Sequence, residues 1–169
     1  AATNHTVEDP DELWEHTYDL NFWPCIRFTR AAIQPMKKNG GGSVINISSV
    51  SGHMGAWPGS SDYGSAKAAV LMLTKNWAMD FAPHNIRVNA VTPALIHSPL
   101  WDELAKECVP EFGKDAQDVM TNFGNSLPRK RMGHISEVGY LVAFLASEAK
   151  AGFITGVIWD IDGGWTKSI

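Results

Sequence analysis

Two residues that could carry out proton transfer, Tyr63 and Lys67, lie one helical turn apart in the segment Asp62–Lys67. Four positions are just over one turn of an α-helix, so both side chains would project from the same face, one above the other. An ammonium beside a phenol favours the ionised phenolate and would tune the phenol for proton transfer nearer neutral pH. The pair predicts an acid–base tyrosine, although in most sequences this spacing marks only an exposed Tyr and a solvated Lys.

A serine pair makes this pattern far more specific. The run Ser43–Ser48 is rich in β-branched residues and predicts a strand buried on both faces. Ser49 follows at once, ahead of a Gly-rich loop at about residues 50–60 that leads into the Tyr63 helix. Hydroxyl groups at the end of a strand, just before such a helix, indicate a site and not a chance match.

Asn21 lies within a helix predicted over residues 9–38, which begins at an Asp-Pro-Asp-Glu capping pattern and stops at Asn-Gly-Gly-Gly. Pro24 cannot donate a hydrogen bond to the carbonyl of Leu20, so a kink is expected beside Asn21. A buried amide needs hydrogen-bond partners, and a bond to a neighbouring loop explains Asn21 as well as a functional role does. Asn21 shares a predicted buried stripe with Trp14, Tyr18, Cys25, Phe28 and Ala32.

Two further strands are predicted, at Ile86–Thr92, which Pro93 stops, and at Val157–Asp162. Helices predicted at residues 63–82 and 136–148 alternate with them. This order predicts an α/β fold: a doubly wound parallel sheet, Rossmann-like, with helices on both faces. Ligands bind such sheets at the carboxyl ends of the strands, where the serine pair falls.

Composition sets the class of protein. The chain has 169 residues, which suits one domain, and its 44% hydrophobic and 19% charged residues are typical of a soluble globular protein. A formal net charge of −4 argues against nucleic acid and anionic membranes as partners. Cys25 and Cys108 fit a reducing compartment, and no apolar run reaches membrane-spanning length, so a cytoplasmic location is expected.

One expected element of a dinucleotide-binding sheet is not seen. Gly40–Gly42 precedes a strand and does not follow one, so it is interpreted as a turn and not as a phosphate cradle. With three strands evident, residues 1–169 are interpreted as a single partial domain, the C-terminal half of a doubly wound sheet. The strand at Ser43–Ser48 would then have an open flank.

The chain resembles the short-chain dehydrogenase/reductase family over nearly all of residues 10–165. The resemblance implies an NAD(P)-dependent oxidoreductase that interconverts an alcohol and a carbonyl compound by hydride transfer, with NAD or NADP as cofactor. It rests on motifs in the family's order, which are Asn21, Asn46–Ser49, Tyr63–Lys67, Arg87–Pro93, Thr155–Gly156 and Asp162–Gly164.

The family's catalytic tetrad falls on Asn21, Ser49, Tyr63 and Lys67. By this resemblance, Tyr63 would exchange a proton with the substrate oxygen and Ser49 would hydrogen-bond that oxygen. Lys67 would bind the nicotinamide ribose beside Tyr63, and Asn21 would hold a water that links Lys67 to solvent. Ser49 is chosen over Ser48 because Ser-Val-Ser-Gly matches the family's register.

Further cofactor contacts follow from the segment after the second strand. By the resemblance, the residues beside the nicotinamide carboxamide would be Pro93, Ala94, Ile96 and Ser98. Residues 95–132 form a long irregular insertion with short helical segments near Leu100–Cys108 and Asp115–Phe123, and they are predicted to be a substrate lid. By the resemblance, Trp57 and Trp101 would lie near the pocket, which suggests a moderately apolar substrate; a place in the core or in an interface explains either residue equally well. His53, His84 and His134 lack metal-ligand spacing, so no metal is expected.

A different class of function is also considered. Because the phosphate-binding turn is missing, the chain could instead be a catalytically silent piece that acts only by associating through its helices. In either case a homo-dimer or homo-tetramer is expected, formed through the helices at 9–38 and 61–82, because the second helix has apolar residues on two sides.

Overall fold

The computed structural model describes residues 6–55 and 57–166. Its centre is a parallel sheet of order β1-β2-β5, made of β1 (Gly42–Ile47), β2 (Ile86–Pro93) and β5 (Ile158–Ile161). The three predicted strands and their parallel direction are confirmed. The register pairs Thr92 of β2 with Asp160 of β5, which brings both side chains to the carboxyl end of the sheet.

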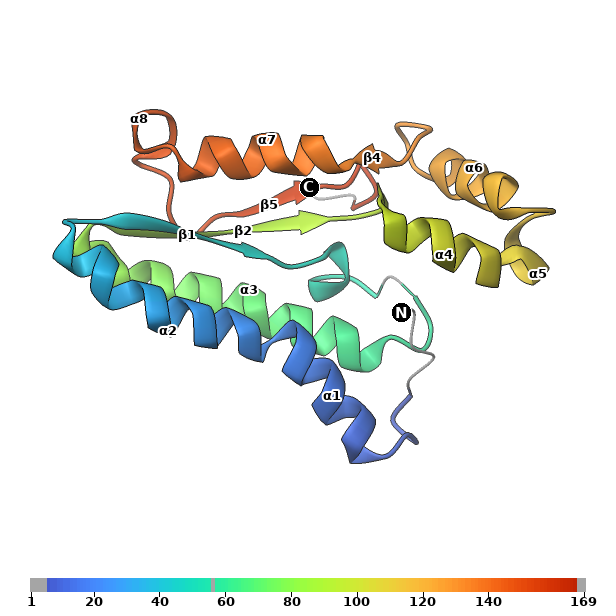
Figure 1. Cartoon of the computed structure of the whole chain (residues 1–169), viewed down its shortest axis with the longest axis horizontal. Coiled ribbons are helices and arrows are strands. Elements are labelled where there is room, and N and C mark those ends of the chain that lie inside the picture. The colour runs from blue at the N-terminus through green and yellow to red at the C-terminus, as the bar shows by residue number, and fades with distance from the viewer. Residues whose placement is uncertain (1–5, 56, 167–169) are drawn as a thin grey trace.

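Helices cover both faces of this sheet (Figure 1). On one face lie α1 (Asp11–Asn21), α2 (Trp23–Lys38) and α3 (Ser61–Phe81). On the other face lies α7 (Ile135–Ala146), followed by the short α8 (Glu148–Ala151). The α/β layering predicted from the alternation of strands and helices is therefore correct.

The helix predicted over residues 9–38 is two helices, because the chain breaks at Phe22 between α1 and α2. Pro24 lies in the first turn of α2, where a missing N–H costs nothing. The start is also corrected: the N-cap is Pro10, without a side-chain hydrogen bond, and not Asp9, the first residue of the predicted capping pattern. The predicted buried stripe fails at Phe28, whose side chain is 75% exposed, whereas the adjacent Thr29 is buried.

The strands differ in burial. β2 lies in the middle of the sheet, and each of its residues is buried except Pro93, which is partly buried. β1 was predicted to be buried on both faces, which is wrong: only Asn46 is fully buried and Ile47 is 44% exposed. The reason is that β1 forms an edge, with one strand partner among the described residues, as the predicted open flank implied.

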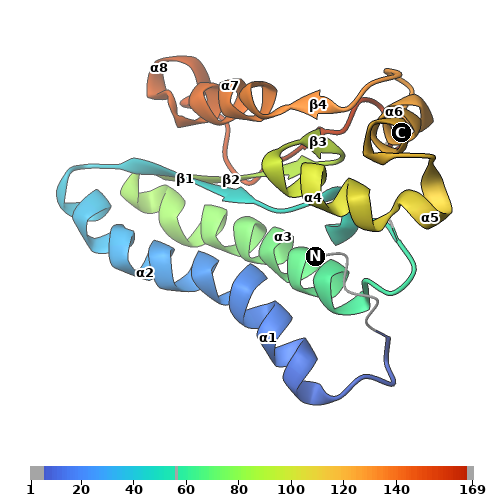
Figure 2. The ribbon, with the colours of Figure 1, turned by 45° about the vertical axis from the view of Figure 1, so that its right-hand side comes forward.

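Residues 95–132 fold into three helices beyond the carboxyl ends of the strands (Figure 2). These are α4 (Pro99–Glu107), α5 (Val109–Phe112) and α6 (Ala116–Ser126), of which α4 and α6 match the predicted helical segments. A two-stranded parallel ribbon of β3 (Ile96–His97) and β4 (Gly133–His134) closes the insertion and was not predicted.

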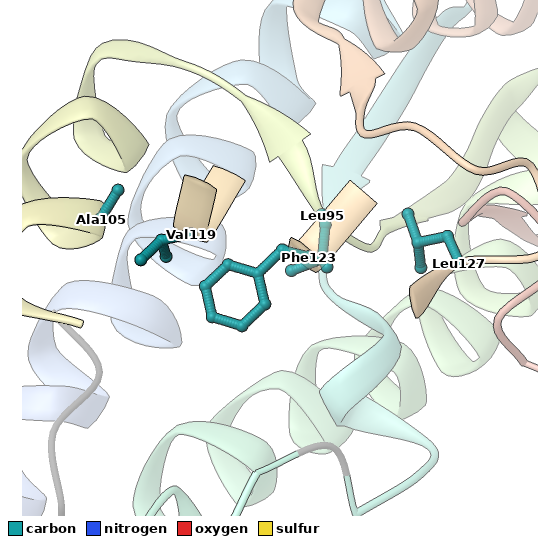
Figure 3. Packing of buried hydrophobic residues seen from close by; sticks show 5 residues of the cluster. All are labelled: Leu95, Ala105, Val119, Phe123 and Leu127. Atoms are coloured by element: carbon teal, nitrogen blue, oxygen red, sulfur yellow. The ribbon is translucent and has the colours of Figure 1, made fainter. Parts of the chain in front are cut away.

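The insertion has a hydrophobic core of its own (Figure 3). Phe123 of α6 is 7% exposed and lies in the middle of this core. A packed core gives the segment a defined position over the edge of the sheet. The buried members are Leu95, Ala105, Val119, Phe123 and Leu127.

Two features are absent from residues 6–55 and 57–166. No helix in that part of the chain is both long and apolar enough to cross a bilayer. Nor does that part contain a group of three or more His, Cys, Asp or Glu side chains that could hold a metal ion.

Candidate active site

Tyr63 and Lys67 share one face of the first turns of α3, as their spacing predicted. The Lys67 ammonium lies 5.5 Å from the centre of the Tyr63 ring, in cation–π range. It also donates a hydrogen bond of 3.3 Å to the backbone carbonyl of Ile47, at the end of β1. Both side chains are partly buried at the carboxyl edge of the sheet.

The protonation of these two groups differs from the sequence-based expectation. Burial raises the pKa of Tyr63, and a hydrogen bond with the Ser49 side chain only partly offsets this. The predicted lowering of the Tyr63 pKa by Lys67 is therefore wrong for the cofactor-free chain. The reason is that removal of the phenol from solvent, which favours its neutral form, is the largest effect on its pKa. Burial lowers the pKa of Lys67, and the neighbouring Cys25 thiol opposes that shift.

The two serines have different surroundings. Ser49 caps the short 3₁₀ turn η1 (Val50–Gly52): its hydroxyl accepts a 3.2 Å hydrogen bond from the Ser51 N–H. The Ser49 side chain also lowers the pKa of the Tyr63 phenol, against the larger effect of burial. The Ser48 hydroxyl is buried and donates to the backbone carbonyl of Lys67, at 2.9 Å. Ser48 is thus engaged in packing against α3, and the assignment of Ser49 to the site stays a prediction.

Glycine lets this turn lie directly on α3. A Cβ added at Gly52 would come within 2.9 Å of the Lys67 backbone carbonyl carbon, closer than real Cβ contacts allow. A Cβ at Gly64 would lie 3.1 Å from the backbone oxygen of Ser51. Backbone therefore meets backbone where the Ser49 turn approaches the Tyr63 helix.

Asn21 is the last residue of α1 and is partly buried. Its side-chain N–H donates to the backbone carbonyl of Thr17, one turn earlier, at 3.0 Å. Among the described residues it makes no hydrogen bond with Lys67. Its predicted role as the holder of a water beside Lys67 stays a prediction.

The segment expected beside the nicotinamide leaves the carboxyl end of β2. The Ala94 N–H donates to the carbonyl of Ile161 at 3.3 Å, which joins the segment to the end of β5. Ser98 caps α4 through its extended backbone, without a side-chain hydrogen bond. The predicted contact residues share one edge of the sheet and are each partly buried: Pro93, Ala94, Ile96 and Ser98.

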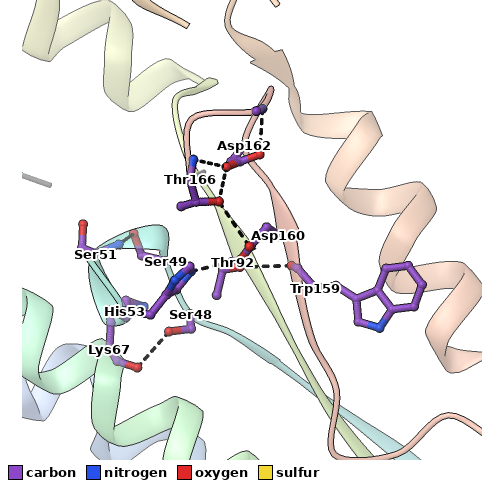
Figure 4. A network of polar contacts seen from close by, with 11 residues as sticks. Ser48, Ser49, Ser51, His53, Lys67, Thr92, Trp159, Asp160, Asp162 and Thr166 are labelled. Atoms are coloured by element: carbon purple, nitrogen blue, oxygen red, sulfur yellow. Dashed lines mark hydrogen bonds and ion pairs between the residues drawn. The ribbon is translucent and has the colours of Figure 1, made fainter. Parts of the chain in front are cut away.

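A polar network beside this segment was missed by the sequence analysis (Figure 4). Asp160 of β5 is its centre. It accepts hydrogen bonds from the hydroxyls of Thr92 and Thr166, and it pairs with His53 at 3.0 Å. The network therefore ties the loop after Ser49 to the end of the sheet. The only hint in the sequence is the alternation Asp160-Ile161-Asp162, which sends both carboxylates to one side of a strand.

Asp162 continues the network toward the C-terminal end of the described chain. Burial acts to raise its pKa. Hydrogen bonds from the Thr166 hydroxyl and from the Thr166 and Gly164 N–H groups outweigh that effect, and they lower the pKa of Asp162 below its usual value. The carboxylate is thus held ionised where the chain turns away from β5.

An aromatic cluster joins the insertion to the loop before α3. Phe123 of α6 makes edge contacts with Trp57 at 5.7 Å and with Trp101 at 5.4 Å between ring centres. Trp57 also meets Trp165 at 5.9 Å. Both tryptophans expected near the pocket thus belong to one cluster that connects residues 95–132 with the segment leading to Tyr63.

Comparison with known proteins identifies the family. A family model described as enoyl-(acyl carrier protein) reductase matches residues 1–166. The chain belongs to the short-chain dehydrogenase/reductase family. Within this family, the oxidoreductase UcpA of Salmonella typhimurium is 36% identical over 148 residues, which is 88% of the chain and 55% of UcpA. The 3-oxoacyl-[acyl-carrier-protein] reductase FabG of Thermotoga maritima is 34% identical over 94% of the chain and 59% of FabG.

Solved structures of the family give the same picture. The L-sorbose reductase of Gluconobacter frateurii, complexed with NADPH and L-sorbose, superposes with a TM-score of 0.92 at 30% identity. It covers 100% of the chain, which in turn covers 64% of the reductase. The aldohexose dehydrogenase of Thermoplasma acidophilum, in ligand-free form, gives a TM-score of 0.88 at 33% identity, over 98% of the chain and 64% of the dehydrogenase. The chain thus spans a little over half the length of its curated relatives.

Proposed function

We propose that the protein is an NAD(P)-dependent oxidoreductase that interconverts a small alcohol and the corresponding ketone or aldehyde. One arrangement carries the proposal: the Lys67 ammonium lies over the Tyr63 ring at 5.5 Å, and the Ser49 side chain, at the same edge of the sheet, lowers the pKa of that phenol. A hydroxyl and a phenol that converge at the edge of a parallel sheet can both bind one substrate oxygen.

In the reducing direction, the Tyr63 hydroxyl donates its proton to the carbonyl oxygen of the substrate, and in the oxidising direction the phenolate takes it from the alcohol. Ser49 donates a hydrogen bond to the same oxygen and holds it near the reacting carbon. The raised pKa of Tyr63 keeps the phenol protonated and ready to donate in the cofactor-free chain. Asn21 completes the proposed tetrad by holding a water that connects Lys67 with solvent.

The residues at the site fit the nicotinamide end of NAD or NADP. The Lys67 ammonium and the Tyr63 hydroxyl are donors suited to the two hydroxyls of a ribose. When bound, the nicotinamide supplies or accepts the hydride. The flanking wall would come from the segment at the end of β2, through Pro93, Ala94, Ile96 and Ser98. The described residues give no basis for preferring NAD over NADP.

The substrate is proposed to enter beneath the insertion at residues 95–132, which lies over the edge that carries the site (Figure 2). The cluster of Trp57, Trp101 and Phe123 offers an apolar wall there. Family members as different as a cyclopentanol dehydrogenase and an L-sorbose reductase match this chain. We therefore propose a small alcohol or ketone with a moderately apolar surface as the substrate, and the cytoplasm as the location.

The test replaces Tyr63 by Phe in the full-length enzyme. Loss of one positioned acid–base group should lower kcat by about 10²- to 10⁴-fold, with the unfolding temperature little changed. Tyr140→Phe is the matched control, because that side chain is 74% exposed on α7. Turnover by Tyr63→Phe at the level of the control would refute the assignment.

A second candidate is a silent piece that acts through association. Its support is a set of large apolar side chains exposed on the helical face: Phe28 is 75% exposed, Met72 61% and Met79 69%. The same surface is our proposed interface for a homo-dimer or homo-tetramer, through α1, α2 and α3. Titration of NADH and NADPH against the purified 169-residue chain separates the candidates, since micromolar binding favours the enzyme and no binding favours the silent piece. A monomer by light scattering would contradict the interface.

A further inference from the structure

A fully buried carboxylate adjoins the proposed acid–base tyrosine. Asp62 is 0% exposed and lies in the first turn of α3, immediately before Tyr63. One of its oxygens accepts a 2.7 Å hydrogen bond from the Tyr63 N–H. The other accepts a 2.5 Å hydrogen bond from the hydroxyl of Thr17, on α1. Each carboxylate oxygen therefore has a donor, which is what a buried charge requires.

Thr17 extends this connection to a second member of the proposed tetrad. Its side chain bonds to Asp62, and its backbone carbonyl accepts the 3.0 Å hydrogen bond from the Asn21 side chain. Thr17 itself is 6% exposed on a helix whose other residues are partly or fully exposed. The main buried attachment of α1 thus runs from Asn21 through Thr17 to the residue beside Tyr63.

We propose that Asp62 is a positioning residue for this site. With Thr17 it holds the end of α1 against the first turn of α3, and so fixes the separation between Asn21 and Tyr63. The inference deepens the proposed function and rests on it.

Stabilisation of the start of α3 does not by itself explain why the Asp62 carboxylate is buried. A carboxylate at the N-terminus of a helix gives that benefit while exposed to solvent. Burying one carries a desolvation cost that only well-placed donors offset. Its donors include the backbone of Tyr63 and a side chain from another helix, so the carboxylate takes part in the contact between the two helices.

The experiment compares three variants of the full-length enzyme. Thr17→Val removes the hydroxyl with little change of shape, and Asp62→Ala removes both acceptors. Asp62→Asn keeps an acceptor for the Tyr63 N–H and an amide that the Thr17 hydroxyl can meet by rotating. We expect Thr17→Val and Asp62→Ala to lower kcat by about 10- to 100-fold, since small misplacements of reacting groups have effects of this size. Asp62→Asn should recover kcat to within about threefold of the wild type.

Thr74→Val is the matched control. Thr74 is also a fully buried threonine, on α3, and its hydroxyl accepts a 2.9 Å hydrogen bond from the side chain of Asn46. Its loss should lower the unfolding temperature about as much as Thr17→Val does, with kcat unchanged. KM should change less than kcat in the Thr17 and Asp62 variants, because the defect lies in the alignment of the reacting groups.

Two results would overturn the inference. One is wild-type kcat in a folded Thr17→Val enzyme, which remains informative even where Asp62→Ala does not fold. The other is an Asp62→Asn enzyme as impaired as Asp62→Ala. Failure of the proposed function itself is recognised separately, because it would leave Tyr63→Phe active.

Discussion

The Ser48 hydroxyl donates a 2.9 Å hydrogen bond to the backbone carbonyl of Lys67. This bond ties the end of β1 to the second turn of α3. Its neighbour Ser49 instead caps the turn η1, and its side chain lowers the pKa of the Tyr63 phenol. The two adjacent serines therefore have different surroundings, and only Ser49 is proposed to act on the substrate.

The serine pair gives the first prediction. Ser49→Ala should lower kcat by about 10²- to 10³-fold, because it removes a donor to the reacting oxygen. Ser48→Ala should keep near-normal turnover and lose about 1 kcal/mol of unfolding free energy, since it removes one hydrogen bond between the end of β1 and α3. Steady-state kinetics and urea titration of both variants check this. The reverse ranking of the two variants in kcat would contradict the assignment.

The second prediction concerns pH. Burial raises the pKa of Tyr63, so the phenol of the cofactor-free chain should ionise above the ordinary tyrosine value of about 10. Because the folded state holds this proton more tightly, the contribution to stability is present below that pH and is lost as the pH rises through the folded-state pKa. The Tyr63 pKa is measured by ultraviolet titration of tyrosinate, as the difference between the wild type and the Tyr63→Phe variant.

Ser49→Ala is the informative variant in that titration. The Ser49 hydrogen bond lowers the Tyr63 pKa, so its removal should raise the value further. A Tyr63 pKa that falls in Ser49→Ala would show that the hydrogen bond favours the neutral phenol instead.

The third prediction tests a buried cation of β2. The Arg87 guanidinium donates to the carbonyls of Leu145 at 2.6 Å and Ala146 at 3.3 Å, at the end of α7, and pairs with Glu148 at 3.0 Å. Arg87→Ala should cost about 1–3 kcal/mol of unfolding free energy, because it removes two hydrogen bonds to helix-end carbonyls together with the ion pair to Glu148.

The control for Arg87 is a surface arginine. Arg27 pairs with Asp19 at 2.8 Å, with both side chains more than half exposed. Arg27→Ala should therefore cost less than about 1 kcal/mol. Equal losses for the two arginines would show that burial of Arg87 contributes little.

The fourth prediction concerns the aromatic cluster. Trp57→Ala and Trp101→Ala should each change the ratio of kcat/KM values between a cyclic and a linear alcohol, since both rings pack on Phe123 of the insertion. Trp57→Phe, which keeps an aromatic edge contact, should change that ratio less. Unchanged specificity constants in both alanine variants would remove these residues from the substrate pocket.

Local patterns were enough to predict the sheet and the Tyr63 helix, because strand periodicity and short motifs depend on neighbours in sequence. The choice of Ser49 came from the family resemblance and stays a prediction. Pro24 predicted a disturbance of the helix, but not that the helix is divided at Phe22. The Asp160 network and the direction of the Tyr63 pKa shift were missed. Both depend on burial and on contacts between segments far apart in sequence, such as His53 with Asp160.

Gly52 has a consequence for how such an enzyme can change. A single methyl group at this position would collide with the main chain of Lys67. The distance between Ser49 and Tyr63 is therefore set where two stretches of backbone are in contact. Under the proposed function, new substrates would be accommodated through the insertion at residues 95–132, while the spacing of the proposed reacting groups stays fixed by the main chain.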